Sequence, residues 1–362
     1  MSFTSHTSPK WFAKDPGFVV CLGTVVFLAI LLGYQAIGFS VVRSDVAEYI
    51  SWSQNLALAT RAFASHMPGY PALLAAARLL TIHLIGSALL AQAICFLFWV
   101  AAVFLTSQIL QILAPETKEV GTLIYAFAPF VGVCYTAYPL ADIPAHAFFL
   151  GALWAALHAR WWAFALVTAA GLMIHQAFYP FYFLLALVCL FSRGMKWWHL
   201  VASGVPFAAY YLWMAWSRAD LNWILAYHTK THLTPRKGFL LFDGILGNLL
   251  AFTPLPFVKG LVLLVILLCA GFLAIHFLRR KRWLPLSLLL PLLIYCAASN
   301  NTAEFLVVRL AKIMVFPACL WAAEHPAISG ALRRRSAYWL LTLSLVLTQF
   351  VWAAYTVAYQ SK

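Results

Sequence analysis

The stretch that decides the fold is residues 79–115, LLTIHLIGSALLAQAICFLFWVAAVFLTSQILQILAP, which contains no Asp, Glu, Lys or Arg in 37 residues. About 20 predominantly apolar residues suffice to cross a bilayer as an α-helix. Residues 17–42, 161–192 and 337–361 are uncharged in the same way. These four stretches predict several membrane-spanning helices.

Composition excludes the soluble classes of protein. Only 9% of the 362 residues are Asp, Glu, Lys or Arg, and 64% are apolar, whereas a soluble domain usually carries about 25% charged residues. Too little polar surface remains to cover a globule in water. The chain is therefore expected to be an all-α, polytopic transmembrane helical bundle in a single domain over 1–362, without a soluble domain.

We expect about eleven spans, within a range of ten to thirteen, and 71–80 is a candidate half-span. The first run is too long for the apolar part of a signal peptide and is expected to stay as a span. The predicted spans lie near 17–39, 84–113, 120–137, 139–158, 162–176, 178–192, 198–217, 252–278, 284–299, 305–323 and 338–358.

The excess of cations sets the predicted orientation. The formal net charge is +14, which in a soluble protein would suggest a nucleic-acid partner. In this chain 13 of the 24 cations fall on one predicted membrane face, including the clusters 279–282 and 333–335. Basic loops stay cytoplasmic and anchor against anionic headgroups. We therefore expect a cytoplasmic N-terminus and no nucleic-acid partner. The compact length and the absence of a retention motif favour a bacterial inner membrane location.

Two predicted non-cytoplasmic loops are long enough to carry function. They are residues 41–71 and 218–250. The first contains Val46, Tyr49, Ile50, Ser53 and Leu56 at helical spacing, which predicts an amphipathic helix lying in the membrane interface.

The first of these loops holds the first candidate residues. Asp45 and Glu48 are one helical turn apart and share a face, so one of them could act as a general base at the membrane surface. A solvated helix face with Arg43 as ion partner is the competing interpretation. Further on, His66-Met-Pro68-Gly69-Tyr70-Pro71 forms a rigid turn, which either presents His66 and Tyr70 at a pocket or only starts a helix.

Later segments add charged residues inside predicted spans. Asp142 lies between Pro139 and Pro144, with His146 four residues on; a buried carboxylate is costly unless it is paired or hydrated. Asp142 therefore either belongs to a functional site or caps the N-terminus of a helix. Arg309 and Lys312, after Glu304, either snorkel or bind an anion such as a phosphate. Lys259 is near enough in the predicted topology to join them.

Other known site types are missing from the sequence. The seven cysteines contain no C-x-x-C pair and are expected to be core or lipid-facing residues. Nucleotide-binding loops, the H-E-x-x-H zinc motif and the G-x-S-x-G nucleophile motif do not occur. If a divalent cation such as Mg²⁺ or Mn²⁺ is used, the candidate ligands are Asp45, Glu48 and Asp142.

In order and spacing these residues resemble the membrane-embedded C-type glycosyltransferases (the GT-C superfamily), which include protein mannosyltransferases and aminoarabinose transferases. The resemblance rests on an early loop Asp, then His66-Met-Pro-Gly-Tyr-Pro71, then Tyr138-Pro-Leu-Ala-Asp-Ile-Pro144, and finally Arg309 before Pro317. The two first-loop acids are separated by two residues here, whereas many members have them in succession. A large soluble C-terminal domain, found in several members, is not expected here.

The resemblance implies a polyprenyl-phosphate sugar donor and transfer at the non-cytoplasmic face with inversion at the anomeric carbon. The acceptor would be a glycolipid, a polysaccharide or a protein. Asp45 would be the catalytic base, and Arg309 with Lys312 or Lys259 would stabilise the departing phosphate. Asp142, with Glu48 or His146, would orient a substrate.

Two other classes of protein stay open at this point. One is a transporter or flippase for a lipid-linked or anionic solute, with Arg309 and Asp142 as intramembrane charges, although inverted repeats are not visible. The other is a membrane acyltransferase that uses His66 or His175 as its base.

Overall fold

Helices form the described part of the chain in the computed structural model, and this confirms the all-α prediction. The helices α1 (Pro16–Ala36), α5 (Ser87–Leu113), α14 (Pro254–Arg279) and α19 (Arg335–Gln360) contain stretches long and apolar enough to cross a membrane. They indicate a multi-pass membrane protein; the count of eleven spans stays a prediction. The structure describes residues 16–42, 44–54, 67–81, 85–128, 132–218, 242–251, 254–298, 304–332 and 334–360.

Shorter helices occupy most of the remaining described chain. They are α2 (Ser44–Gln54), α4 (Gly69–Leu80), α6 (Lys118–Ala126), α7 (Cys134–Ala137), α8 (Asp142–Leu157), α9 (Trp161–Ile174), α10 (Tyr179–Ser192), α11 (Trp197–Arg218), α13 (Asp243–Leu249), α15 (Trp283–Ala298), α16 (Glu304–Leu310), α17 (Val315–Ala323) and α18 (Pro326–Leu332), with 3₁₀ turns η2 (Pro115–Thr117), η3 (Gln176–Phe178) and η5 (Ala311–Met314).

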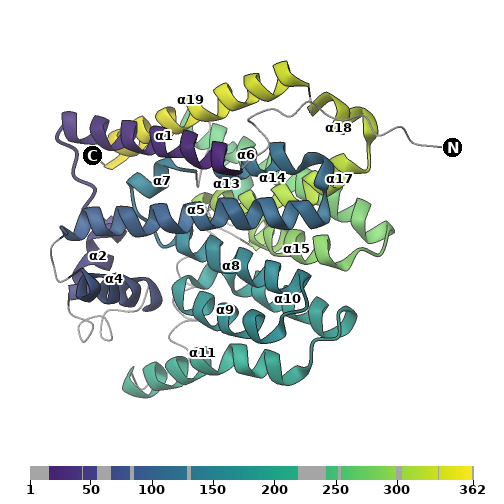
Figure 1. Ribbon diagram of the computed structural model, residues 1–362, viewed down its shortest axis with the longest axis horizontal. Helices are drawn as coiled ribbons and strands as arrows, with labels where there is room; N and C mark the ends of the chain where they lie inside the picture. The colour runs from purple at the N-terminus through teal and green to yellow at the C-terminus, as the bar shows by residue number, and fades with distance from the viewer. Residues whose placement is uncertain are drawn as a thin grey trace.

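The long helix α5 runs through the middle of the bundle (Figure 1). Helices α1 and α19 lie on one side of it in this view, and α8 to α11 form the other side. At the left end of the view, α2 and α4 pack together beside the end of α5. This end also receives the C-terminal end of α1.

Close approach of α1 to α5 depends on a glycine. A Cβ atom at Gly23 would overlap the indole ring of Trp99. The indole is held in place because its Nε1 donates to the carbonyl oxygen of Ala126, at 3.0 Å. Small residues permit such close contact between membrane helices, so Gly23 sets the distance between α1 and the centre of the bundle.

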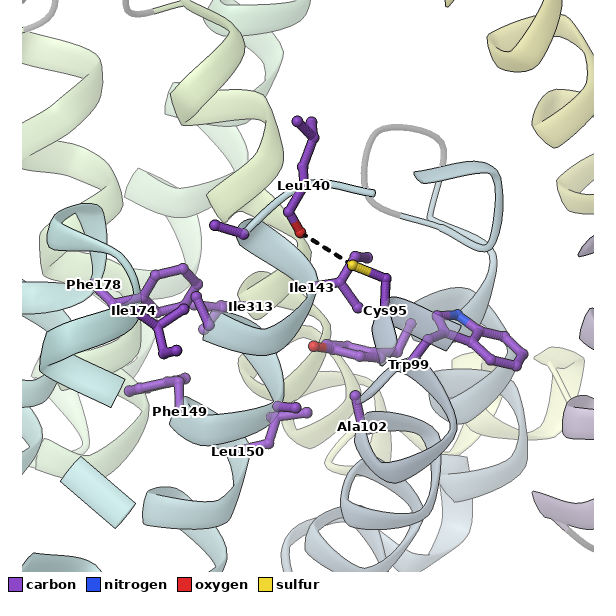
Figure 2. Packing of buried hydrophobic residues seen from close by; sticks show 14 of the residues in the cluster. Cys95, Trp99, Ala102, Leu140, Ile143, Phe149, Leu150, Ile174, Phe178 and Ile313 are labelled. Carbon is purple, nitrogen blue, oxygen red and sulfur yellow. Dashed lines mark hydrogen bonds between the residues drawn. The ribbon is translucent and has the colours of Figure 1, made fainter. Parts of the chain in front are cut away.

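Buried apolar side chains fill the space between α5, α8 and the helices beyond them (Figure 2). Cys95 on α5 lies against the turn before α8, with its Sγ 3.6 Å from the carbonyl oxygen of Leu140. Phe149 and Phe178 pack on the far side of α8, their ring centroids 5.8 Å apart. The turn that precedes Asp142 is therefore fixed by the core.

Two predicted spans are interrupted. The span expected over 120–137 is split into α6 and α7, and the span expected over 305–323 consists of α16, η5 and α17. The first break is held by Gln349 of α19, whose Nε2 donates to the carbonyl of Phe127 while its Oε1 accepts from the N–H of Cys134. A side chain more than 200 residues away thus satisfies the backbone groups that the break exposes.

The amphipathic helix expected in the first long loop is present as α2. Its buried residues include Val46, Tyr49, Ile50 and Ser53, as the spacing predicts, and Glu48 is exposed. Helix α2 packs on α4, where the rings of Tyr49 and Tyr70 lie 5.0 Å apart. Leu56, the last residue of the predicted stripe, lies outside the described residues.

Candidate functional site

The candidate site is built around Asp142, in the first turn of α8. Its side chain is buried, with 2% of the residue exposed. The N-cap residue of α8 is Ala141, and no side-chain cap bond forms there, so Asp142 does not cap the helix. A carboxylate in the first helical turn is stabilised by the helix dipole, but a buried charge also needs a direct partner.

Arg309, in the last turn of α16, supplies that partner. Its Nη1 donates to Oδ2 of Asp142 at 3.0 Å. The other oxygen, Oδ1, accepts no hydrogen bond from the described residues. The nearest charged or titratable group recorded there is His175 Nε2, at 3.8 Å. One oxygen of the carboxylate is therefore buried without a hydrogen-bond donor among the described residues.

His175 has a defined tautomer in this arrangement. Its Nδ1 accepts from the backbone N–H of Ala177, at 3.2 Å, at the start of η3. In the neutral ring the proton is then on Nε2, the atom that faces Asp142. His175 therefore presents an N–H toward Oδ1.

The backbone carbonyl of Arg309, just before the 3₁₀ turn η5, also contacts a site residue. In a continuous α-helix the carbonyl of Arg309 would accept from the N–H four residues later. That residue, Ile313, lies within η5, where hydrogen bonds join residues three apart rather than four. The carbonyl oxygen of Arg309 lies 3.2 Å from His146 Nε2. A carbonyl only accepts, so Nε2 carries the proton.

Tyr125 connects His146 to Lys312. Its hydroxyl lies 3.2 Å from His146 Nδ1, which accepts from it. The Nζ of Lys312 lies 4.0 Å from the centre of the Tyr125 ring, a cation–π contact. Lys312 is 5% exposed. The buried amino group of Lys312 is therefore linked through Tyr125 and His146 to the backbone of Arg309, the partner of Asp142.

An apolar cavity of about 650 Å³ reaches this region. It lies between α6, α14 and α17, and Lys312 is one of its lining residues. Along α14 it extends from Leu261 to Cys269, about 12 Å at the rise of an α-helix. Ligand sites are commonly mainly apolar pockets of this size with a few polar groups. The cavity thus combines an apolar wall with one deeply buried cation.

Helix α2 brings Asp45 toward the same region. Burial raises the pKa of the Tyr49 phenol well above its usual value, and the charges of Asp45 and then Asp142 raise it further, while Arg309 lowers it. Tyr49 is buried four residues after Asp45 on the same helix. Asp45 is half-buried and Glu48 is exposed. Part of the Asp45 side chain is therefore accessible from outside the bundle.

The other predicted site residues have different surroundings. Tyr70 is fully buried, and its hydroxyl is hydrogen bonded with Cys95 Sγ at 3.1 Å, so it fixes α4 to α5. Lys259 is half-buried near the start of α14, a helix that contacts α16. Glu304 begins α16. His66 lies outside the described residues. Their roles in binding stay predictions.

Tyr125 and Tyr49 belong to the site without a sequence signal that predicts it. An aromatic residue in an apolar helix is usually core, and only the contacts with Lys312 and the charged residues distinguish these two. His175 is predicted above only as a possible base of an acyltransferase. The signal that could have found it is the pair His175-Gln176 interrupting an uncharged stretch.

No group of three His, Cys, Asp or Glu side chains suited to a metal occurs within the described residues. The divalent cation stays a prediction.

Comparison with known proteins gives no relative. No family model, no curated protein and no solved structure matches the chain.

Proposed function

We propose that the chain is a glycosyltransferase that moves a sugar from a polyprenyl-phosphate donor to an acceptor hydroxyl at the non-cytoplasmic face of the membrane. The observation that carries the proposal is the buried Asp142–Arg309 ion pair, with Lys312 beside it on the wall of an apolar cavity. A lipid-linked donor needs both parts: an apolar surface for its chain and cations for its phosphate.

Each of the charged residues Arg309, Lys312 and Asp142 would have a separate role in this reaction. Arg309 is held in place by Asp142, so a phosphate would meet a positioned guanidinium. Lys312 would supply a second cation from the cavity wall. The free oxygen of Asp142 would accept a hydrogen bond from a substrate hydroxyl.

Asp45 is the proposed base. As the acceptor hydroxyl loses its proton to the Asp45 carboxylate, the acceptor oxygen forms a bond to the anomeric carbon. The bond between that carbon and the phosphate oxygen breaks, and the polyprenyl phosphate leaves with the electron pair. Attack opposite to the leaving group inverts the configuration.

Replacement of Asp45 by Asn tests the proposal. Membranes containing the variant would receive a labelled polyprenyl-phosphate sugar and acceptor, and we expect transfer to fall by about 10²- to 10⁴-fold, the usual contribution of a general base. Glu116→Gln removes an exposed carboxylate from η2, a turn that contributes no residue to the cavity lining, and should leave transfer unchanged. Wild-type transfer by Asp45→Asn would contradict the proposed mechanism.

A transporter for the same lipid is the second candidate, because the cavity and its buried cation would also suit passage of an anionic headgroup. Reconstituted vesicles distinguish the two. A transporter would move labelled donor between leaflets without acceptor, and Asp45→Asn would leave this movement intact. The glycosyltransferase would instead yield glycosylated acceptor and free polyprenyl phosphate.

A further inference from the structure

A second group of charged residues lies at the C-terminal end of α14, where Arg279, Arg280, Lys281 and Arg282 follow one another. The helix ends in a Schellman motif: the N–H of Arg282 bonds to the carbonyl of Phe277, and that of Lys281 to the carbonyl of Leu278. Lys281 takes the left-handed conformation that this motif requires, with φ of 55°. The turn therefore fixes the directions in which the four cations leave the helix.

A single carboxylate binds several of these donors. Oε2 of Glu324 accepts from Arg280 at 2.6 Å and from His276 Nε2 at 2.9 Å, and Oε1 accepts from Arg282. Both oxygens are thus occupied. Arg279 is exposed and forms no ion pair within the described residues. The cluster has an excess of positive charge, and Arg279 is one of the cations that Glu324 does not neutralise.

A separate shallow cavity of about 350 Å³, open at the outer surface of α14, adjoins this cluster. It is lined by Phe272, Ile275, His276, Arg279 and Arg280. These positions are spaced by three to four residues, so they form one strip along α14. Phe272 and Ile275 are 56% and 54% exposed, although they lie within a helix apolar enough to span a membrane. Exposed apolar side chains thus lie one to two helical turns before the cations on the same strip of α14.

We propose that this cavity binds one anionic phospholipid. Its phosphate would interact with Arg279 and with the face of Arg280 that Glu324 leaves free, and an acyl chain would lie on Phe272 and Ile275. Guanidinium groups form paired hydrogen bonds with phosphate oxygens. Basic pockets beside membrane helices are suited to anionic headgroups. A phospholipid matches this strip because its acyl chain would lie on the apolar residues and its anionic headgroup would lie on the arginines.

The proposal does not depend on the glycosyltransferase activity. Its residues lie at the C-terminal end of α14, whereas Lys259, a residue of the proposed donor site, is near the N-terminal end. The lipid would be a component of the bilayer that stays bound, and it would contact α14 beside its ion pairs with α17.

Lipid titration of the purified full chain, followed by native mass spectrometry, tests the proposal. With dioleoyl-phosphatidylglycerol we expect one lipid bound well before any other, with dioleoyl-phosphatidylcholine bound about tenfold more weakly. Arg279→Gln should weaken phosphatidylglycerol binding about fivefold and leave the Arg280–Glu324 contact in place. Arg334→Gln, which removes an exposed arginine between α18 and α19, is the matched control and should bind as wild type.

The result that overturns the proposal is equal binding of phosphatidylglycerol to Arg279→Gln and wild type, or an equal loss in Arg334→Gln, which would indicate a general charge effect. Inorganic phosphate separates a lipid site from an anion site. Millimolar phosphate should leave the bound phospholipid in place, because the acyl chain contributes to binding. Displacement by phosphate alone would contradict a lipid site. Arg279→Lys, which keeps the charge without the paired donors, should give intermediate binding.

Discussion

Arg309 Nη1 donates to Asp142 Oδ2 over 3.0 Å, and this contact joins the last turn of α16 to the first turn of α8 across 167 positions of the chain. Both residues belong to predicted spans, in which a lone charge would be costly. The pair therefore has a structural consequence as well as a proposed chemical one: each residue makes the other tolerable inside the bundle.

Removing one member of this pair should destabilise the chain more than removing both. We expect Asp142→Asn or Arg309→Gln to cost about 3–5 kcal/mol, because the remaining charge stays buried without its partner. The double variant should recover part of that loss. Thermal unfolding in detergent of the wild type, both single variants and the double variant forms a double-mutant cycle. Strictly additive losses would show that the pair is not coupled.

The hydrogen bonds of His146 predict two losses of stability of different size. His146→Phe should cost about 1–3 kcal/mol, because it leaves the Tyr125 hydroxyl and the Arg309 carbonyl without their partner. Tyr125→Phe removes one hydroxyl and keeps the ring beneath Lys312, so its cost should be smaller. Unfolding temperatures measure both, and a larger loss in Tyr125→Phe would contradict the hydrogen-bond assignment.

His175 should affect the reaction more than the fold. Its Nε2–H faces the free oxygen of Asp142, so His175→Phe should lower transfer at saturating donor by about tenfold while the unfolding temperature changes little. His175→Asn offers a replacement N–H donor and should restore part of the rate. Transfer assays with both variants decide this, and a large drop in unfolding temperature would show that the η3 turn, not the carboxylate, needs the imidazole.

The packing of α1 on α5 predicts a steric effect. Gly23→Val should destabilise the chain by about 1–3 kcal/mol, because the added atoms overlap Trp99 and the indole is held by Ala126. Gly33→Val is a matched control on the same helix, where a Cβ meets no atom within 4 Å. Unfolding in detergent should distinguish the two, and equal effects would mean that helix propensity, not contact with Trp99, decides the outcome.

Orientation is testable by cysteine labelling. In a variant without the exposed native Cys21 and Cys269, we expect a cysteine at Glu48 to react with an impermeant maleimide added outside intact cells. A cysteine at Arg334 should react only after the membrane is opened. Both sites are exposed in the fold. The reverse pattern would overturn the predicted topology and the face at which transfer is proposed.

The positions of the helices could be predicted from the sequence because each depends on a local apolar run. Helices α5, α8 and α15 begin and end within three residues of the predicted spans. The two broken spans could not be predicted in this way. One break depends on Gln349 and the other exposes a carbonyl to His146, and both partners are distant in sequence.

The candidate charges were predictable for a similar reason: Asp142, Arg309 and Lys312 are conspicuous in an apolar chain. Their pairing was not, since either cation could have approached the carboxylate. In the structure Arg309 forms the ion pair with Asp142, and Lys312 packs against the ring of Tyr125. The aromatic members of the site cannot be separated from ordinary core residues until the three-dimensional contacts are known.

The 3₁₀ turn η5 has a mechanical consequence. Residues in a 3₁₀-helix advance by about 120° each, and those in an α-helix by about 100°. A change of winding across Ala311–Met314 would therefore swing Lys312 around the helix axis while Asp142 keeps Arg309 where it is. The angle between these two side chains around the helix axis is therefore set by the winding of this single turn.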